Sequence, residues 1–389
     1  MTDPEHRERL RRWRLVLGGP AEDALGAATG RDGAMDAALA TLYDAAEDAD
    51  GERRAGRSGG LGGSAPRVAR WLGDIREYFP RTVVQVMQAD AIERLDLTRL
   101  LLEPEMLAAV EPDVHLVGTL LSLNRVMPAE AKQAARRVVR SVVDDLERRL
   151  AQRTRAAVAG ALNRAARIRR PRHADIDWDR TIRANLRHYQ VAHRTVIPQR
   201  LIGYGRRASA VHRDVVLCVD QSGSMASSVV FAGVFAAVLA SVRSLRTSLV
   251  VFDTAVVDLT EQLSDPVEVL FGTQLGGGTD INRALAYTQQ LVTRPRDTIV
   301  VLVSDLYEGG VREQMLRRVA ELTAAGVQVV ALLALSDEGA PAYDHENAAA
   351  LAGLGVPAFA CTPDAFPELM AAAIERRDLM AFAQRHTAG

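Results

Sequence analysis

The sequence has a single lysine, few cysteines and no excess of charge, and each of these shortages excludes a class of protein. Lys132 stands alone among 48 basic residues, which face 49 acidic ones, so that the net charge is −1. Such a balance creates no field that would draw the whole chain to nucleic acid or to an anionic membrane. The two cysteines are too few for a disulfide framework, and Cys218 lies in an apolar run, where a small buried side chain is expected.

Long apolar runs are also scarce. The longest, 229–242, falls short of the roughly 20 residues that span a bilayer and ends at Arg243. The first residues, MTDPEHRERLRRW, are charged from the start and lack the apolar core of a signal peptide. We therefore expect a cytoplasmic protein that does not contact a membrane.

The 389 residues are enough for two or three domains, and the composition changes along the chain. The stretch DADGERRAGRSGGLGGSAP is too rich in glycine and charge to bury a core, which predicts a flexible linker. Val142, Leu146 and Leu150 recur at helical spacing, and strand signals are scarce in this part of the chain. The predicted parts are a short helical segment (1–47), the linker (48–66), a helical domain (67–163), a basic connector (164–213) and a C-terminal domain (214–380).

From residue 214 onward, short β-branched runs alternate with helical segments. This alternation predicts an α/β fold with a doubly wound, mostly parallel sheet, preceded by the mainly α-helical region. The predicted strands are 215–219, 248–252, 255–259, 298–304, 327–333 and 356–360, and the predicted helices are 229–242, 281–292, 311–325, 347–354 and 364–373. Only the second and third strands are joined tightly enough for a hairpin, which places one antiparallel strand at an edge.

Oxygen-bearing side chains stand where ligands bind in such sheets, at the carboxyl ends of the strands. Asp220, Ser222 and Ser224 follow the first strand, Thr279 lies in the glycine-rich LGGGTD, and Asp305 follows the strand 298–304. Hard divalent cations prefer oxygen ligands. The pattern therefore predicts a Mg²⁺ site, which Mn²⁺ could also fill. With so few carboxylates the metal would keep positive charge and attract a further anionic ligand.

These five residues, in this order and spacing, resemble the metal-ion-dependent adhesion site of von Willebrand factor A (VWA) domains. The resemblance covers the chain from about residue 214 to 373. It implies that Ser222, Ser224 and Thr279 bind the metal directly or through water, while Asp220 and Asp305 act mainly through water. It also implies that an Asp or Glu of a protein partner completes the coordination, and that the protein has no catalytic residues.

The motifs IDWDRTIRANLRHY, VDQSGSM, LGGGTDI and SDLYEGG narrow the resemblance to the bacterial CoxE-like branch of intracellular VWA proteins. Members of that branch carry a helical N-terminal region, as here. Several are associated with MoxR-type AAA+ ATPases in protein remodelling or metallocofactor maturation. The resemblance thus implies an adaptor whose metal grips an acidic residue of such an ATPase or of its client.

Two other functions are compatible with the same residues. Asp220 could be the phosphoryl-accepting nucleophile of a Mg²⁺-dependent phosphatase, with Asp305 on the metal. That chemistry favours a second carboxylate and a lysine nearby, whereas Ser222 stands beside Asp220 and the only lysine is distant in sequence. Alternatively, the basic run RIRRPR (167–172) could contact RNA phosphates, although the chain has no wider basic excess.

Overall fold

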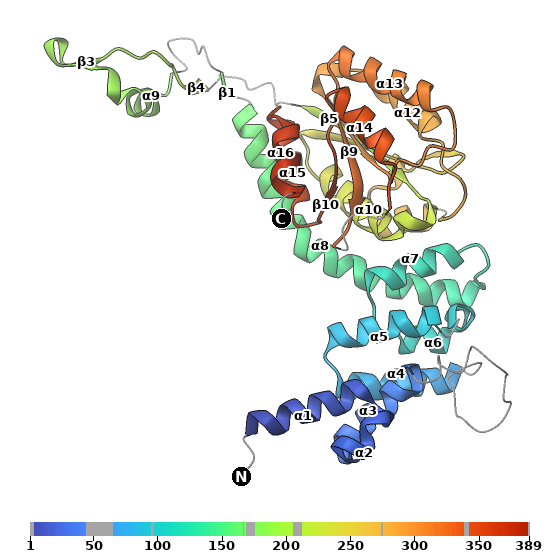
Figure 1. The fold of residues 1–389 in the computed structure, drawn as a ribbon. Coiled ribbons are helices and arrows are strands. Elements are labelled where there is room, and N and C mark those ends of the chain that lie inside the picture. The colour runs from blue at the N-terminus through green and yellow to red at the C-terminus, as the bar shows by residue number, and fades with distance from the viewer. Residues whose placement is uncertain are drawn as a thin grey trace. The chain divides into compact units, whose positions relative to one another are not determined.

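A computed structural model describes residues 4–43, 65–94, 97–165, 167–168, 176–204, 212–273, 275–337 and 342–387. Contacts within the chain divide it into two units, Met1–Val142 and Val143–Gly389. The division falls inside the 37-residue helix α8 (Ala129–Ala165), whereas the helix itself ends close to the predicted 163/164 boundary (Figure 1). The predicted linker 48–66 lies outside the described residues except for its last two, which begin α4.

The first unit is helical, as predicted. Its helices have local sequence causes: Asp113 caps α7 by accepting a hydrogen bond from the Leu116 N–H at 2.7 Å, and Pro104 occupies the first turn of α6. The elements before α8 are α1 (Pro4–Leu17), η1 (Gly19–Ala21), α2 (Glu22–Leu25), α3 (Gly30–Tyr43), α4 (Ala65–Tyr78), α5 (Arg81–Arg94), η3 (Leu97–Leu102), α6 (Pro104–Ala109) and α7 (Val114–Leu123).

The predicted connector contains short elements of both kinds. There are two small antiparallel ladders and one short helix. Strands β1 and β4 pair and lie before and after the helix in sequence, and strands β2 and β3 pair and both follow it. The elements are β1 (Arg167–Ile168), α9 (Trp178–Ala184), η5 (Leu186–His188), β2 (Tyr189–Gln190), η6 (Val191–His193), β3 (Thr195–Val196) and β4 (Gly203–Tyr204).

The C-terminal part of the second unit is an α/β domain built on a six-stranded sheet. The strands are β5 (Arg213–Asp220), β6 (Leu245–Phe252), β7 (Val256–Asp258), β8 (Thr298–Val303), β9 (Gln328–Leu335) and β10 (Ala358–Cys361). Their spatial order is β10-β9-β8-β5-β6-β7, and all neighbours are parallel except β6 and β7. The predicted fold class and antiparallel edge strand are confirmed. Because β5 lies between β8 and β6, residues that follow β5 and β8 meet at one edge.

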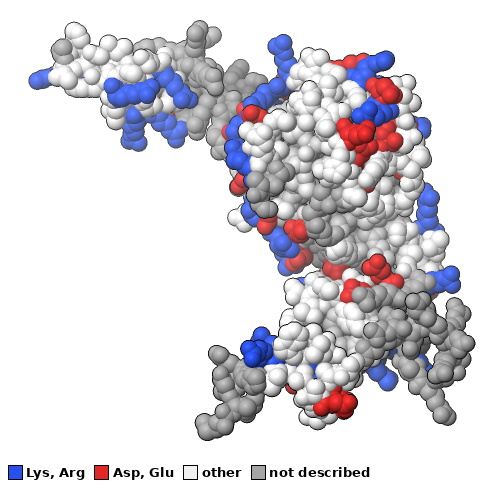
Figure 2. Space-filling view, viewed as in Figure 1, with Lys and Arg blue, Asp and Glu red and all other residues white. Residues whose placement is uncertain are grey.

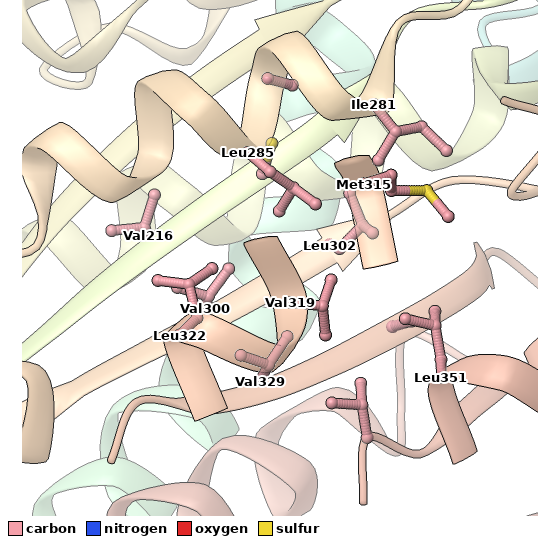
Figure 3. Packing of buried hydrophobic residues seen from close by; sticks show 14 of the residues in the cluster. Val216, Ile281, Leu285, Val300, Leu302, Met315, Val319, Leu322, Val329 and Leu351 are labelled. Atoms are coloured by element: carbon pink, nitrogen blue, oxygen red, sulfur yellow. The ribbon is translucent and has the colours of Figure 1, made fainter. Parts of the chain in front are cut away.

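Helices cover both faces of the sheet. On one face α12 (Ile281–Leu291), α13 (Arg312–Ala325) and α14 (His345–Gly353) bury side chains against alternate residues of the strands, as Figure 3 shows for Leu285, Val319 and Leu351. The other face holds α10 (Ala226–Ala240), which contacts β5, β6 and β9. Helix α15 (Phe366–Ile374) was predicted from the sequence. The elements that were not predicted are α11 (Pro266–Gly272), α16 (Leu379–Thr387), η7 (Gly223–Met225), η8 (Thr260–Gln262) and η9 (Pro295–Asp297).

Helix α10 corrects one expectation about apolar runs. Together with the preceding turn it forms the stretch Gly223–Ala240, which is long and apolar enough to cross a membrane by length and composition. Its residues from Ser228 to Leu239 are all buried inside the α/β domain, and the Phe235 ring lies 4.3 Å from that of Phe366 on α15. Burial between a sheet and helices accounts for a helix that is apolar all round.

Candidate metal site at the strand ends

Two carboxylates are buried side by side at the carboxyl edge of the sheet. Asp220 is the last residue of β5 and is fully buried, and Asp305 comes two residues after the end of β8 and is 5% exposed. The parallel pairing of β5 with β8 runs up to Val219 and Val303, so the two chains leave the sheet next to each other. The topology therefore places both predicted acidic residues at one point.

Asp220 is held by donors from both loops. Its Oδ1 accepts a hydrogen bond from the Ser222 N–H at 2.9 Å, and its Oδ2 accepts one from the Ser304 hydroxyl at 2.8 Å. The Ser304 Oγ in turn accepts the Leu306 N–H at 3.0 Å. Ser304 is fully buried and was not among the predicted site residues. Its place directly before Asp305 was the available signal. Sequence alone, however, does not distinguish a serine that supports the site from one that only forms a turn.

Asp305 is joined to the first loop by the two serines. The Ser224 hydroxyl donates to Asp305 Oδ2 at 2.7 Å, and the Ser222 and Ser224 hydroxyl oxygens lie 3.3 Å apart. A turn closed by the Met225 N–H on the Ser222 carbonyl, at 2.9 Å, brings the two hydroxyls together. Four of the five predicted site residues thus form one hydrogen-bonded set.

Thr279 reaches the same edge through its main chain. Its carbonyl accepts the Gly309 N–H at 2.8 Å, and a Cβ on Gly309 would lie only 2.6 Å from that oxygen, so only glycine allows this approach. On the other side, the Gly276 N–H donates to the Gln221 carbonyl at 3.0 Å. The loop containing Thr279 therefore bridges the other two. No side-chain hydrogen bond joins Thr279 to the other four predicted residues in the part of the chain that the structure describes.

The electrostatics of the site favour a cation. Burial raises the pKa of Asp220 to about 6, against the lowering effect of its bonds to Ser222 and Ser304, and the negative charge of Asp305 raises it further. Among the described residues no ion pair joins either aspartate to a basic side chain, and no group of three or more His, Cys, Asp or Glu side chains could hold a metal. Donors here are two carboxylates and nearby hydroxyls, the hard oxygen atoms that fit Mg²⁺.

The alternative functions gain little from the structure. The sole lysine, Lys132, belongs to the first unit, and the residue two places from Asp220 that a phosphatase would use as a second carboxylate is Ser222. Of the basic run 167–172, only Arg167 and Ile168 lie within the described residues, where they form β1.

The chain is similar to known proteins in both sequence and fold. Residues 150–370 match the family described as VWA domain containing CoxE-like protein. The Uncharacterized protein YehP of Escherichia coli (strain K12) is 37% identical over 355 residues, which cover 91% of this chain and 93% of that protein.

Similar solved structures include an aerotolerance-related membrane protein of Bacteroides fragilis NCTC 9343 carrying multiple mutations to serines. It is 15% identical, with a TM-score of 0.33 over 42% of this chain and 99% of that one. A von Willebrand factor type A protein of Catenulispora acidiphila is 14% identical, with a TM-score of 0.32 over 43% of this chain and 42% of that one.

Proposed function

We infer the function from the family: this chain belongs to the VWA domain containing CoxE-like proteins, and its VWA domain is a protein-interaction domain. We propose that binding to the partner depends on Mg²⁺. The observation that carries this proposal is the buried pair Asp220 and Asp305, held in register by Ser222 and Ser224. Two buried carboxylates are costly without positive charge, and a divalent cation at this edge would offset that cost.

The residues have distinct roles in this proposal. Ser222 and Ser224 present their hydroxyls at the surface of the site, and Thr279 adds a third hydroxyl from the neighbouring loop. Asp220 and Asp305 lie deeper and supply negative charge, directly or through water. When bound, the metal would supply a positive centre that attracts an anionic group, while the hydroxyl ligands leave it incompletely neutralised. An Asp or Glu of a partner protein is the group that we expect to bind there.

The identity of the partner is proposed from the CoxE-like resemblance. We propose that it is a MoxR-type AAA+ ATPase or its client, that the complex acts in protein remodelling or metallocofactor maturation, and that it does so in the cytoplasm. The chain itself is proposed to be non-enzymatic. The surroundings of Asp220 support this, since the hydroxyl of Ser304 and the N–H of Ser222 engage its two oxygens and no basic side chain pairs with it among the described residues.

The test measures metal binding first and partner capture second. Isothermal titration of Mg²⁺ into the protein should show one site, lost in the double variant Ser222→Ala/Ser224→Ala and retained in Ser264→Ala, a serine exposed elsewhere on the domain. Capture of a purified MoxR-type AAA+ ATPase of the same organism should require Mg²⁺ and fail in EDTA. Capture that survives both EDTA and the double variant would rule out the metal bridge.

A phosphate-ester assay separates the enzymatic alternative. We expect no Mg²⁺-dependent hydrolysis of p-nitrophenyl phosphate above that of the Asp220→Asn variant. Turnover that is present in the natural chain and lost in this variant would instead identify Asp220 as a nucleophile.

A further inference from the structure

Helix α9 and the turn after it bury polar side chains and expose apolar ones. Thr181 and Asn185, four residues apart, are 0% and 2% exposed. Ile182 and Leu186, also four residues apart, are 42% and 58% exposed. A surface helix ordinarily shows the reverse arrangement, with its apolar stripe against the core. The helix therefore exposes to solvent the apolar side that is ordinarily packed against the core.

The inversion is built into the segment by a hydrogen-bond network. The Asn185 side-chain amide donates to the Arg200 carbonyl at 2.8 Å, while its oxygen accepts the N–H groups of Gln199 and Arg200 at 3.0 and 3.2 Å. The Thr181 hydroxyl donates to the Ile202 carbonyl and accepts the Ile202 N–H. These bonds hold the irregular segment 199–202 against α9. The orientation of the helix is thus fixed from its polar side, and Ile182 and Leu186 cannot turn inward without breaking the network.

Further exposed apolar side chains follow the helix in the chain. Tyr189 is 49% exposed, Val191 80% and Ile197 56%, and all three belong to or adjoin the β2–β3 hairpin, in which Tyr189 pairs with Val196. With Ile182 and Leu186 these residues define what we call the α9 face. Concentrations of exposed apolar side chains rimmed by polar ones mark interaction sites.

Arginines border the α9 face. Arg183 directly follows Ile182 in the sequence, and Arg187 directly follows Leu186, so the two arginines form a row next to the apolar one. Arg194 lies in the turn of the β2–β3 hairpin. All three are exposed, and blue side chains gather along this segment in Figure 2. Two acidic residues lie in this segment: Asp177 caps α9 through the Arg180 N–H, and Asp179 is exposed in the first turn of α9. Residues 176–204 contain five arginines against these two aspartates. The border is thus positive, which favours an acidic occupant.

We propose that the α9 face binds an amphipathic segment of a partner protein whose apolar row is flanked by Asp or Glu. The apolar row would pack on Ile182, Leu186 and Val191, and its acidic flank would pair with Arg183 and Arg187. A protein segment fits better than a lipid surface, because the apolar side chains are divided between a 7-residue helix and a hairpin and do not form one continuous amphipathic helix. This binding is independent of the metal site.

The experiment uses three fluorescein-labelled helical peptides and the full-length protein. The first peptide has a leucine row flanked by glutamates, the second replaces the glutamates by lysines, and the third has the first composition in scrambled order. Anisotropy should show binding of the first peptide only. Binding should weaken at least tenfold in Ile182→Ser/Leu186→Ser and in Arg183→Glu/Arg187→Glu, and should be unchanged by EDTA. Matched controls are Leu354→Ser and Arg246→Glu, which alter exposed residues elsewhere.

Several outcomes would overturn the proposal. Equal binding of the lysine or scrambled peptide would remove the charge or the pattern from the recognition, and absence of binding by the first peptide would remove the site. Binding to vesicles with 30% phosphatidylglycerol that the apolar double variant abolishes, without peptide binding, would assign the face to a membrane. Sedimentation that shows a dimer dissociated by the same variant would assign it to a second copy of the chain.

Discussion

The carboxyl edge of the β-sheet and the α9 segment differ in which side chains they bury. At the sheet, apolar side chains are covered on both faces and two carboxylates are buried with them. In the α9 segment, Thr181 and Asn185 are buried and the apolar side chains face solvent. Each region therefore holds one kind of side chain in an unfavourable environment: charged carboxylates are buried at the sheet, and apolar side chains are exposed in the α9 segment.

Burial and charge together are the basis of the two proposals. The buried negative charge is the reason for proposing a cation, and the positively bordered apolar surface is the reason for proposing an acidic amphipathic partner. In both regions a hydrogen-bond network holds the unfavourable arrangement: Ser304 and Ser222 do so around Asp220, and Asn185 does so beneath α9. Rigid placement by such networks is what a binding site requires.

The largest contrast between the regions concerns apolar side chains. Phe235 is fully buried against Phe366, so Phe235→Ala should lower the free energy of unfolding by about 3–5 kcal/mol, as expected for a large core truncation. Urea denaturation followed by far-ultraviolet circular dichroism measures it, with an unchanged slope as the control. A loss below about 1 kcal/mol would mean that α10 is not part of the cooperative core.

Charge should separate the regions next. Saturating Mg²⁺ at a hundred times its Kd should stabilise the natural chain by about 2.7 kcal/mol, and Asp220→Asn should lose that increment. In EDTA at pH 7.5 the variant should be no less stable than the natural chain. Burial raises the pKa of Asp220 to about 6 in the folded protein, so ionisation of Asp220 destabilises the folded state once the pH rises through that value. Calorimetric melting with and without Mg²⁺ tests both statements. Equal Mg²⁺ stabilisation of the two proteins contradicts the site.

The network under α9 gives a third, local effect. Asn185→Ala removes the acceptor of the N–H groups of Gln199 and Arg200, which lie in part-buried hydrogen bonds, at a net cost of about 0.5–1.5 kcal/mol for each bond. We expect amide hydrogen exchange at these two residues to accelerate by about two- to tenfold, with exchange in β5 unchanged. The control is Asn282→Ala, since Asn282 bonds the side chains of Gln314 and Arg318 on α13. Unaltered exchange at Gln199 would show that the segment 199–202 is held by other contacts.

The smallest effect completes the comparison with Phe235. Ile182 is 42% exposed, so Ile182→Ser should change the free energy of unfolding by less than about 0.5 kcal/mol. Denaturation by urea, under the conditions used for Phe235→Ala, provides the measurement. If the serine variant loses more than about 1 kcal/mol, the side chain is covered within the protein and the α9 face is not available to a partner.

Much of the α/β domain was predictable because its strands and helices have distinct local patterns. All six strands and the five predicted helices occur in order, with bounds that differ by a few residues. The elements that were not predicted include α11 and the three-residue helices η7, η8 and η9, which are short, and the two-residue strands of the predicted connector, which carry no periodicity. Helix α16 was also not predicted, although it is as long as α14 and α15. The split inside α8 was not predictable, since a continuous helical pattern does not reveal which neighbours each half contacts.

For the candidate site, the sequence alone determined the residue types and their positions at strand ends, because β-branched runs and polar turns are local features. Only the tertiary structure decided that Ser304 supports Asp220, that Ser224 bonds Asp305, and that Thr279 joins them through its main chain. It also decided which face of α9 is exposed. These properties depend on contacts between segments far apart in the chain, and no local pattern specifies such contacts.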